Sequence, residues 1–515
     1  MWLLAFSPIL LLLTGMLLFK WEAPKAGALS WFISIAVAWS FFGANPKLLA
    51  LANSKGISLS IYVLLIIWSA IFLYNIVERA GAAHVISKMM QEISDDKMIQ
   101  CLLLSWCFTS LLQGIAGFGV PVAVVAPIMV AMGFDPITSV TCCLIGHSWA
   151  ISFGSMGSSY NAIQLVTKIP GALIGQCMAL VFTIAIFSTG FSVAYLYDGN
   201  NGIRKSIPLI LCTGTVISFA LCFMNFIGIA QLASLAAGIG GCLVLGMWAF
   251  IRKGKKKSIS QPSQNIREMT FNMAASPYYA VILLSMILQV PIIKSVLSPY
   301  HWGLDYPAIA TSLGHTVQAS AGYSRIQFFS HPAPILLVSA VFGICVFTRK
   351  QACGVSRRDF FLACLSNTVR KCVPTSVGIA ATVMMALVMG DSGMTNYIAR
   401  GIATILGKAY PIVSPFIGAL GTFITGSNTN SNIMFGIMQY ETAIMLGKNA
   451  VLIAAAQSVG GSLGVAIAPS AIMTGAANVC PGGCEGEIMK VTMRYCLVNL
   501  TLVGLFVLFL GKHYQ

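Results

Sequence analysis

The chain has 515 residues, of which 57% are apolar and only 9% are Asp, Glu, Lys or Arg, whereas soluble domains carry about 25% of these charged residues. This composition excludes a soluble globular enzyme, a disordered chain and a small disulfide-rich protein, and it favours a membrane protein. The net charge of +16 suits loops at the cytoplasmic face, and the basic runs lack the interleaved aromatic residues that nucleic-acid binding uses.

Apolar segments recur along the whole chain, and a membrane crossing needs about 20 mainly apolar residues. The N-terminal segment lacks a basic start and a small-residue cleavage motif, so we expect a retained first span. We expect about 12 to 14 crossings, with re-entrant pieces among them. The less apolar region 294–331 predicts an interfacial segment on the outer side. In chain order the apolar segments are 1–19, 28–43, 57–77, 98–113, 136–153, 170–190, 206–228, 231–251, 277–293, 333–348, 372–392, 409–425, 433–447, 449–468 and 491–511.

Basic residues cluster in two short loops, Arg252–Lys257 and Arg349–Arg358. The segment 252–276 continues with Ser, Gln and Pro, which predicts a flexible cytoplasmic linker. This linker would separate a first transmembrane half, 1–251, from a second half, 277–515. Two spans separate the linker from the second basic loop, so both loops can lie on one side of the membrane.

Two regions interrupt the apolar sequence in matching ways, one at about 98–190 and one at about 372–480. A broken helix frees backbone groups, which are tolerated at membrane depth only inside protein or along a wet cavity. Matched interruptions in two halves indicate a transport site, and half-helix N-termini that meet there would favour a small anion. The breaks are Gly114–Pro121 and His147–Ser159 in the first region, and Gly418–Asn432 and Gln457–Pro469 in the second.

The second region contains six consecutive polar residues after Gly426. Close packing of membrane helices uses small residues but does not require three asparagines, so we interpret this run as a binding element. Further candidates lie at the other breaks. The predicted substrate-binding residues are Gly117, Phe118, Gly119, Ser155, Ser427, Asn428, Thr429, Asn430, Asn432 and Ser462.

These motifs resemble those of the L-lactate permease family. The resemblance rests on Gly114-Ile-Ala-Gly117-Phe-Gly119-Val-Pro121, Phe153-Gly154-Ser155-Met-Gly157, Asp391-Ser392-Gly393-Met394-Thr395 and Thr425–Gly436, and it extends over roughly residues 1–515. That family imports lactate or glycolate with protons, and it looks like part of a wider group of ion-coupled transporters. The resemblance therefore implies an all-α polytopic protein of the plasma membrane with inverted repeats and re-entrant or broken helices.

The resemblance also implies a secondary transporter for a small 2-hydroxy monocarboxylate, without enzymatic activity and without a cofactor or metal. Three departures from the family pattern lie at the expected cavity. Gln113 stands where an acidic residue is common, and His147-Ser148-Trp149-Ala150 stands where Asn-Thr-Ala-Pro is common. Gly157-Ser158-Ser159 stands where Gly-Thr-Pro is common. A different small organic anion is therefore an alternative substrate. Besides this anion, membrane lipid is the expected partner.

Ionisable groups inside spans are costly and usually functional, and they make His147 and Asp391 the proton-coupling candidates. His147 stands beside a break, and a histidine titrates near neutral pH, so a bound carboxylate would favour its protonated form. The alternative for His147 is a structural hydrogen bond to the backbone. The alternative for Asp391, which precedes Ser392-Gly393, is an N-cap of the next helix.

Three other readings compete with proton-coupled transport. One is a channel, which saturation of the flux and accumulation against a gradient would distinguish from a carrier. Ser427-Asn428-Thr429 resembles the Ser-Asn-Thr tips of sodium-coupled dicarboxylate carriers, and oxygen ligands suit a hard cation, so sodium coupling is possible. A membrane enzyme would need a cluster of acid, base or metal-binding residues, for which His301, Asp305 and His315 are the loose candidates.

Overall fold

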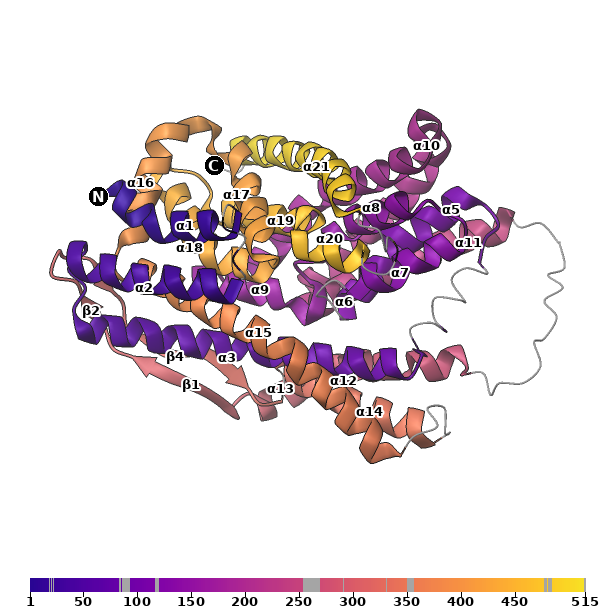
Figure 1. The fold of residues 1–515 in the computed structure, drawn as a ribbon, viewed down its shortest axis with the longest axis horizontal. Coiled ribbons are helices and arrows are strands. Elements are labelled where there is room, and N and C mark those ends of the chain that lie inside the picture. Colours follow the sequence, from indigo (N-terminus) through magenta and orange to yellow (C-terminus); the bar gives the residue numbers. More distant parts are fainter. Residues whose placement is uncertain are drawn as a thin grey trace.

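The computed structural model describes residues 1–513 except 18, 20, 22, 83–84, 86–92, 116–119, 253–268, 290, 330, 350–355, 477–478 and 480–483. The described chain is mostly α-helical, and its helices form two layers (Figure 1). One of them, which we call the support layer, consists of α2 (Ala23–Phe41), α3 (Pro46–Arg79), α12 (Phe271–Gln289), α13 (Pro291–Leu297), α14 (Pro332–Arg349) and α15 (Arg357–Asp391).

Two long helices, α3 and α15, run side by side through the support layer (Figure 1). Asn45 caps the start of α3 and Ser356 caps the start of α15, each accepting a backbone N–H of the first turn. Small residues let the helices approach closely: a Cβ at Gly27 of α2 would lie 3.3 Å from Ala381, and one at Gly56 of α3 would lie 2.7 Å from Met384. With 34 and 35 residues, both helices are about 50 Å long and exceed a bilayer core of about 30 Å.

The second layer, which we call the repeat layer, contains both interrupted regions. Repeat one comprises α5 (Lys97–Cys101), the π-helical η1 (Leu102–Phe108), α6 (Thr109–Ile115), α7 (Val120–Ala131), α8 (Pro136–Gly146), the short η2 (Ser148–Ala150) and α9 (Gly154–Thr167). Its continuation is α10 (Gly171–Phe226), η3 (Ala230–Leu232) and α11 (Ala233–Arg252).

Repeat two comprises α16 (Met394–Leu406), η4 (Gly407–Ala409), α17 (Tyr410–Thr425), α18 (Asn428–Met445), α19 (Ala450–Gly464), η5 (Val465–Ile467), α20 (Pro469–Ala476) and α21 (Glu485–His513). The N-terminal helix α1 (Trp2–Leu17) packs against α2 and α16. We call α17 and α18 together hairpin two, because they are joined by a two-residue turn and pack against each other.

The two repeats interlock through their interrupted helices. The Ser462 hydroxyl of α19 donates to the Ser148 carbonyl of η2 at 2.5 Å, and the Ser152 hydroxyl donates to the Ser458 carbonyl of α19 at 3.0 Å. Beyond these crossings, α18 packs on both α9 and α19. Each repeat therefore places its broken helix against the broken helix of the other.

Eight helices of the described chain are long and apolar enough to cross a membrane, or nine if α8 to α9, bent by 53°, counts as one broken span. The expected all-α polytopic fold with broken helices is thus confirmed, but this count is below the expected number of crossings. One reason is that helices such as α1, with 16 residues, are shorter than a full crossing. The other is that α10, with 56 residues, counts once although Asp198 and Gly199 break it into two arms.

Region 294–331 contains β-strands, which were not predicted when this region was expected to be an interfacial segment. Strand β1 (His301–Tyr306) pairs antiparallel with β4 (Ser320–Gln327), and β2 (Ile309–Ala310) pairs with β3 (Thr316–Val317). The ribbon packs along the first half of α3, where the Tyr306 hydroxyl lies 3.0 Å from Ser54 Oγ and 2.9 Å from Ser58 Oγ.

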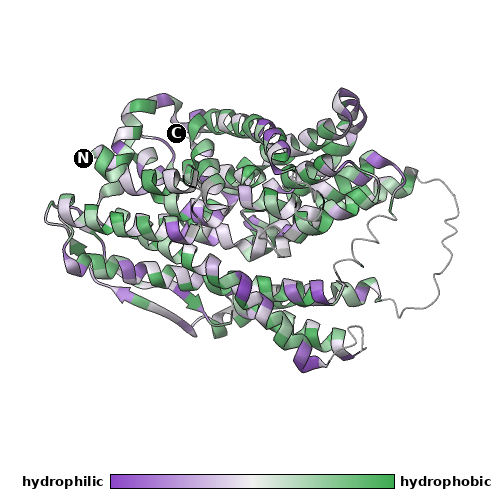
Figure 2. Cartoon of the chain, viewed as in Figure 1, coloured by the Kyte–Doolittle hydropathy of each residue, from purple (hydrophilic) through white to green (hydrophobic). Residues whose placement is uncertain are grey.

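The predicted linker falls largely on residues 253–268, which lie outside the described residues. The ends of α11 and α14 point to the same side of the molecule (Figure 1), as expected for two loops on one face of the membrane. Hydrophilic residues gather at such helix ends, at the bend of α10 and in the middle of the molecule (Figure 2). Both sequence halves contribute helices to each layer. The two predicted halves of the sequence therefore do not correspond to the two layers of the structure.

Candidate functional site

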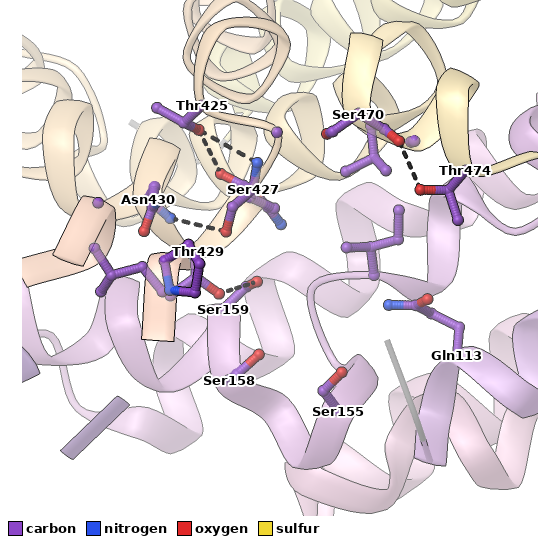
Figure 3. A pocket seen from close by; sticks show the side chains of 18 of the residues that line it. Gln113, Ser155, Ser158, Ser159, Thr425, Ser427, Thr429, Asn430, Ser470 and Thr474 are labelled. Carbon is purple, nitrogen blue, oxygen red and sulfur yellow. Dashed lines mark hydrogen bonds between the residues drawn. The ribbon is translucent and has the colours of Figure 1, made fainter. Parts of the chain in front are cut away.

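A cavity of about 350 Å³ lies where both repeats meet the support layer (Figure 3), a size typical of small-molecule sites. Twelve of the 20 described residues that line it have polar side chains, and none of the 20 is Lys, Arg, Asp or Glu. The polar lining residues are Gln113, His147, Ser155, Ser158, Ser159, Thr425, Ser427, Asn428, Thr429, Asn430, Ser470 and Thr474.

The tip of hairpin two forms one wall of the cavity. Gly426 ends α17 with a φ of 70°, a conformation that glycine adopts at little cost. Ser427 then caps α18, and its hydroxyl accepts the N–H of Asn430 at 3.4 Å. The first N–H groups of a helix have no partner within the helix, so the start of α18 offers donors and a partial positive charge to the cavity.

The asparagines of hairpin two tie it to repeat one. Asn428 Nδ2 donates to Ser152 Oγ at 2.9 Å and to the Ser458 carbonyl at 3.3 Å. Asn432 Nδ2 donates to the Ser159 carbonyl at 3.0 Å and to Ser458 Oγ at 2.9 Å. These bonds fix the start of α18 against both interrupted helices.

The opposite wall comes from the break in repeat one. Ser155, Met156 and Gly157 have φ of 48°, 55° and 72°, and the two non-glycine residues are strained in this left-handed region. The regular part of α9 therefore begins at Ser158. The hydroxyl of Ser159 lies 3.0 Å from that of Thr429 (Figure 3), so the starts of two half-helices, α9 and α18, meet at one cavity.

The support layer closes the cavity with an apolar face. Pro24 of α2 and Pro374, Gly378 and Ile379 of α15 line this side. The cavity therefore lies at the interface between the two layers, and a ligand there would contact both.

His147 ends α8 and also lines the cavity. Its Nδ1 lies 2.6 Å from the Cys143 carbonyl. Only an N–H can bond to a carbonyl oxygen, so this contact assigns the hydrogen to Nδ1 and leaves Nε2 as the basic nitrogen of the neutral ring. The structural hydrogen bond considered from the sequence is present, and it occupies one nitrogen only.

Asp391 occupies a different place from the one the sequence suggested. It is the last residue of α15 and does not line the cavity. Its carboxylate Oδ2 lies 2.9 Å from Lys55 Nζ of α3, under the Tyr306 ring of the β-ribbon, whose centroid is 5.8 Å from the same Nζ. The N-cap alternative is wrong, because Gly393 holds that position before α16.

The cavity brings together six of the predicted residues: Ser155, Ser427, Asn428, Thr429, Asn430 and His147. Asn432 and Ser462 are buried behind it, where their side chains bond to repeat one. Gly117, Phe118 and Gly119 lie outside the described residues, so their predicted role is not placed. The substrate-binding role of the whole set stays a prediction.

Sequence reasoning did not assign roles to several residues that line the cavity. Ser158 and Ser159 follow the strained segment directly, and the Gly-Ser-Ser run at 157–159 was the available signal. Ser470 and Thr474 lie on α20, which begins at Pro469, the end of the second break. Gln113 ends a helix before the first break, where its amide faces the cavity (Figure 3).

Comparisons with known proteins agree on one family. The family model described as L-lactate permease matches residues 1–512. An L-lactate permease of Salmonella typhi is 27% identical over 532 residues, which cover 98% of this chain and 94% of that protein. The glycolate permease GlcA of Escherichia coli (strain K12) is 26% identical over 545 residues, which cover 98% and 95%.

A solved structure shares the fold. MtrF of Neisseria gonorrhoeae, from a class described as antimetabolite efflux pumps, matches with a TM-score of 0.50 and 15% sequence identity. The match covers 95% of this chain and 94% of that chain. At this identity the likeness concerns the fold alone.

Proposed function

The chain belongs to the L-lactate permease family, and we propose that it imports a small 2-hydroxy monocarboxylate, lactate or glycolate, together with protons. As a member of a family of permeases it is a multi-pass transporter of the plasma membrane and not an enzyme. The observation that carries the proposal is the meeting of two half-helix starts at one uncharged, polar cavity.

The carboxylate of the substrate would bind at the starts of α18 and α9. Ser427 and Ser158 line the cavity there, their hydroxyls can donate hydrogen bonds, and both helix starts favour an anion. The 2-hydroxyl needs an acceptor. Asn430 lines the cavity, and its Oδ1 is buried without a hydrogen-bond partner in the described part of the chain, so we assign the 2-hydroxyl to it.

His147 would carry the coupling proton. It is the titratable side chain among the described lining residues, and its Nε2 is left basic by the bond from Nδ1 to Cys143. A carboxylate that enters a cavity without Lys or Arg favours a proton on that nitrogen, because opposite charges attract strongly where water is scarce. Asp391 is paired with Lys55, and this position gives its predicted coupling role no support.

Alternating access would move the repeat layer against the support layer. The cavity lies between the layers, with Pro24, Pro374, Gly378 and Ile379 on the support side. Inverted-repeat transporters commonly expose a midplane site by moving one bundle against another. The smooth apolar face on the support side suits such a movement.

The test is uptake of radiolabelled lactate by the purified protein in liposomes with an imposed pH gradient. We expect accumulation that follows the pH gradient and is unaffected by a membrane potential, because one anion moves with one proton. Glycolate should compete with lactate, and pyruvate, which lacks the hydroxyl donor, should compete less well. Uptake no greater than that of empty liposomes for both acids would refute the proposal.

A further inference from the structure

Hairpin two contains a second group of polar atoms that the proposed substrate does not use. The side-chain oxygens Asn428 Oδ1, Asn432 Oδ1 and Thr422 Oγ1 are buried and have no hydrogen-bond partner among the described residues. The three side chains are 2%, 0% and 0% exposed. A buried oxygen without a partner destabilises the folded protein, so three such oxygens in one hairpin indicate a place where a ligand would be favourable.

The orientation of both amides follows from their hydrogen bonds. Asn428 Nδ2 faces the Ser458 carbonyl, and Asn432 Nδ2 faces the Ser159 carbonyl. A carbonyl oxygen can only accept a hydrogen bond, so each contact must be made by the NH₂ side of the amide. Each Oδ1 therefore points away from that carbonyl, and a flipped amide would lose the bond.

Gly461 of α19 brings two of these oxygens to one place. A Cβ at this position would overlap Asn428 Oδ1 and would lie 3.1 Å from Thr422 Oγ1. An oxygen of α17 and an oxygen of α18 thus both lie beside Gly461. Asn428 connects this pair to the cavity, which it lines, whereas Thr422 and Gly461 do not line the cavity.

Two of the three helix ends around this spot favour a positive ion, whereas the start of α18, at Asn428, carries partial positive charge. Thr422 lies in the last turn of α17, which ends at Thr425, and Gly461 lies in the last turn of α19, which ends at Gly464. Helix C-termini carry partial negative charge and offer unpaired carbonyls, and such ends hold cations in other transporters with broken helices.

We propose that Asn428 Oδ1 and Thr422 Oγ1, beside Gly461, form a site for a hard monovalent cation of the size of sodium. The ligands are neutral oxygens, which suit a hard cation. The described residues hold no cluster of three His, Cys, Asp or Glu side chains, and a divalent ion commonly needs carboxylates. Any effect of this cation on substrate binding at the neighbouring start of α18 rests on the proposed function.

The first experiment measures cation binding without transport. The melting temperature of the purified full-length protein in detergent is recorded in NaCl, KCl and choline chloride at equal ionic strength and fixed pH. We expect a saturable rise in NaCl that choline does not produce, because a ligand that binds only the folded state stabilises it. Equal melting temperatures in all three salts would overturn the proposal, as would a larger rise in KCl than in NaCl.

Three variants link the effect to the site. Thr422→Val keeps the side-chain shape but removes the oxygen, and it should weaken half-maximal sodium stabilisation about tenfold, which equals about 1.4 kcal/mol. Thr422→Ser keeps a hydroxyl and should retain the response. Thr213→Val is the matched control, because Thr213 Oγ1 of α10 is also buried and unpaired but belongs to no cluster in hairpin two. A sodium response that Thr422→Val leaves intact would overturn the assignment.

Lactate uptake separates this inference from the proposed function. At a fixed pH gradient, replacing external sodium by choline should lower uptake by the wild type. If uptake is unchanged without sodium and sodium has no effect on melting, the cation site is refuted, but lactate transport is not. If sodium stabilises a protein that takes up neither lactate nor glycolate, the proposed substrate is refuted, but the cation site is not.

Discussion

The two repeats reach the same cavity with different chemistry. Repeat two turns at Gly426 and Ser427, a glycine at positive φ followed by a helix cap, and it contributes asparagine side chains. Repeat one turns through three left-handed residues, of which Ser155 and Met156 are not glycine, and it contributes serine hydroxyls. The turn of repeat two is therefore unstrained and offers amide groups, whereas the turn of repeat one is strained and offers only hydroxyl groups. We infer that repeat two selects the ligand and that repeat one forms the opposite wall.

The largest effect should come from the asparagine that bridges both repeats. Asn428→Ala removes the amide that donates to Ser152 and Ser458, and we expect uptake to fall to the level of empty liposomes while the protein still reaches the membrane. Asn499→Ala in α21 is the control, because Asn499 is equally buried at 2% exposure and accepts from Ser192 away from the cavity. Normal transport by the Asn428 variant would show that repeat two is not the selective side.

A substitution in repeat one should separate coupling from binding. His147→Gln keeps an amide that can donate to Cys143 but cannot titrate near neutral pH. We expect pH-driven lactate accumulation to be lost, whereas exchange of labelled for unlabelled lactate, which needs no release of the proton, should continue. Accumulation that still follows the pH gradient in this variant would exclude His147 as the proton carrier.

A pair of glycine substitutions tests the difference in space at the two turns. Gly157 and Gly426 have φ of 72° and 70°, so alanine at either costs about 1 to 2 kcal/mol of backbone strain. A Cβ at Gly157 would find its nearest atom at 3.4 Å, whereas one at Gly426 would overlap Ser470 Oγ. Gly426→Ala should therefore lower the melting temperature more than Gly157→Ala. Equal losses would show that Ser470 moves aside freely.

The smallest effect concerns the ends of α9 and α17. The residue after α17 is Gly426, but the residue after α9 is Lys168, with φ 58°. Lys168 is exposed and does not line the cavity, so Lys168→Gly should relieve strain and raise stability by up to about 1 kcal/mol. Lactate uptake should be unchanged. A lower melting temperature would indicate that the lysine side chain stabilises this helix end.

The sequence was sufficient for the features that depend on composition and local chemistry. The lack of charge predicted a membrane protein, and Gly426 followed by Ser427 predicted a break because few other residue pairs end one helix and cap the next. The polar run from Ser427 to Asn432 marked the cavity wall for the same reason. These signals are local, and tertiary contacts did not overrule them.

Features that depend on distant partners were not predictable. Asp391 looked like a cap or a cavity residue because Lys55, its partner, is 336 positions away in the chain. The β-ribbon at 301–327 was missed because its strands are short and irregular, with register shifts on both sides of Leu304. The predicted number of crossings was too high because hydropathy does not distinguish a half-helix from a full span.

The uncharged lining of the cavity has a consequence for energetics in a living cell. Moving one elementary charge across a potential of 100 mV changes its energy by about 2.3 kcal/mol. The described lining has no Lys, Arg, Asp or Glu. When His147 is neutral, the cavity of the unloaded carrier therefore moves no side-chain charge across the membrane potential. Its return to the outer face would then proceed at the same rate in a strongly polarised cell and in a depolarised one.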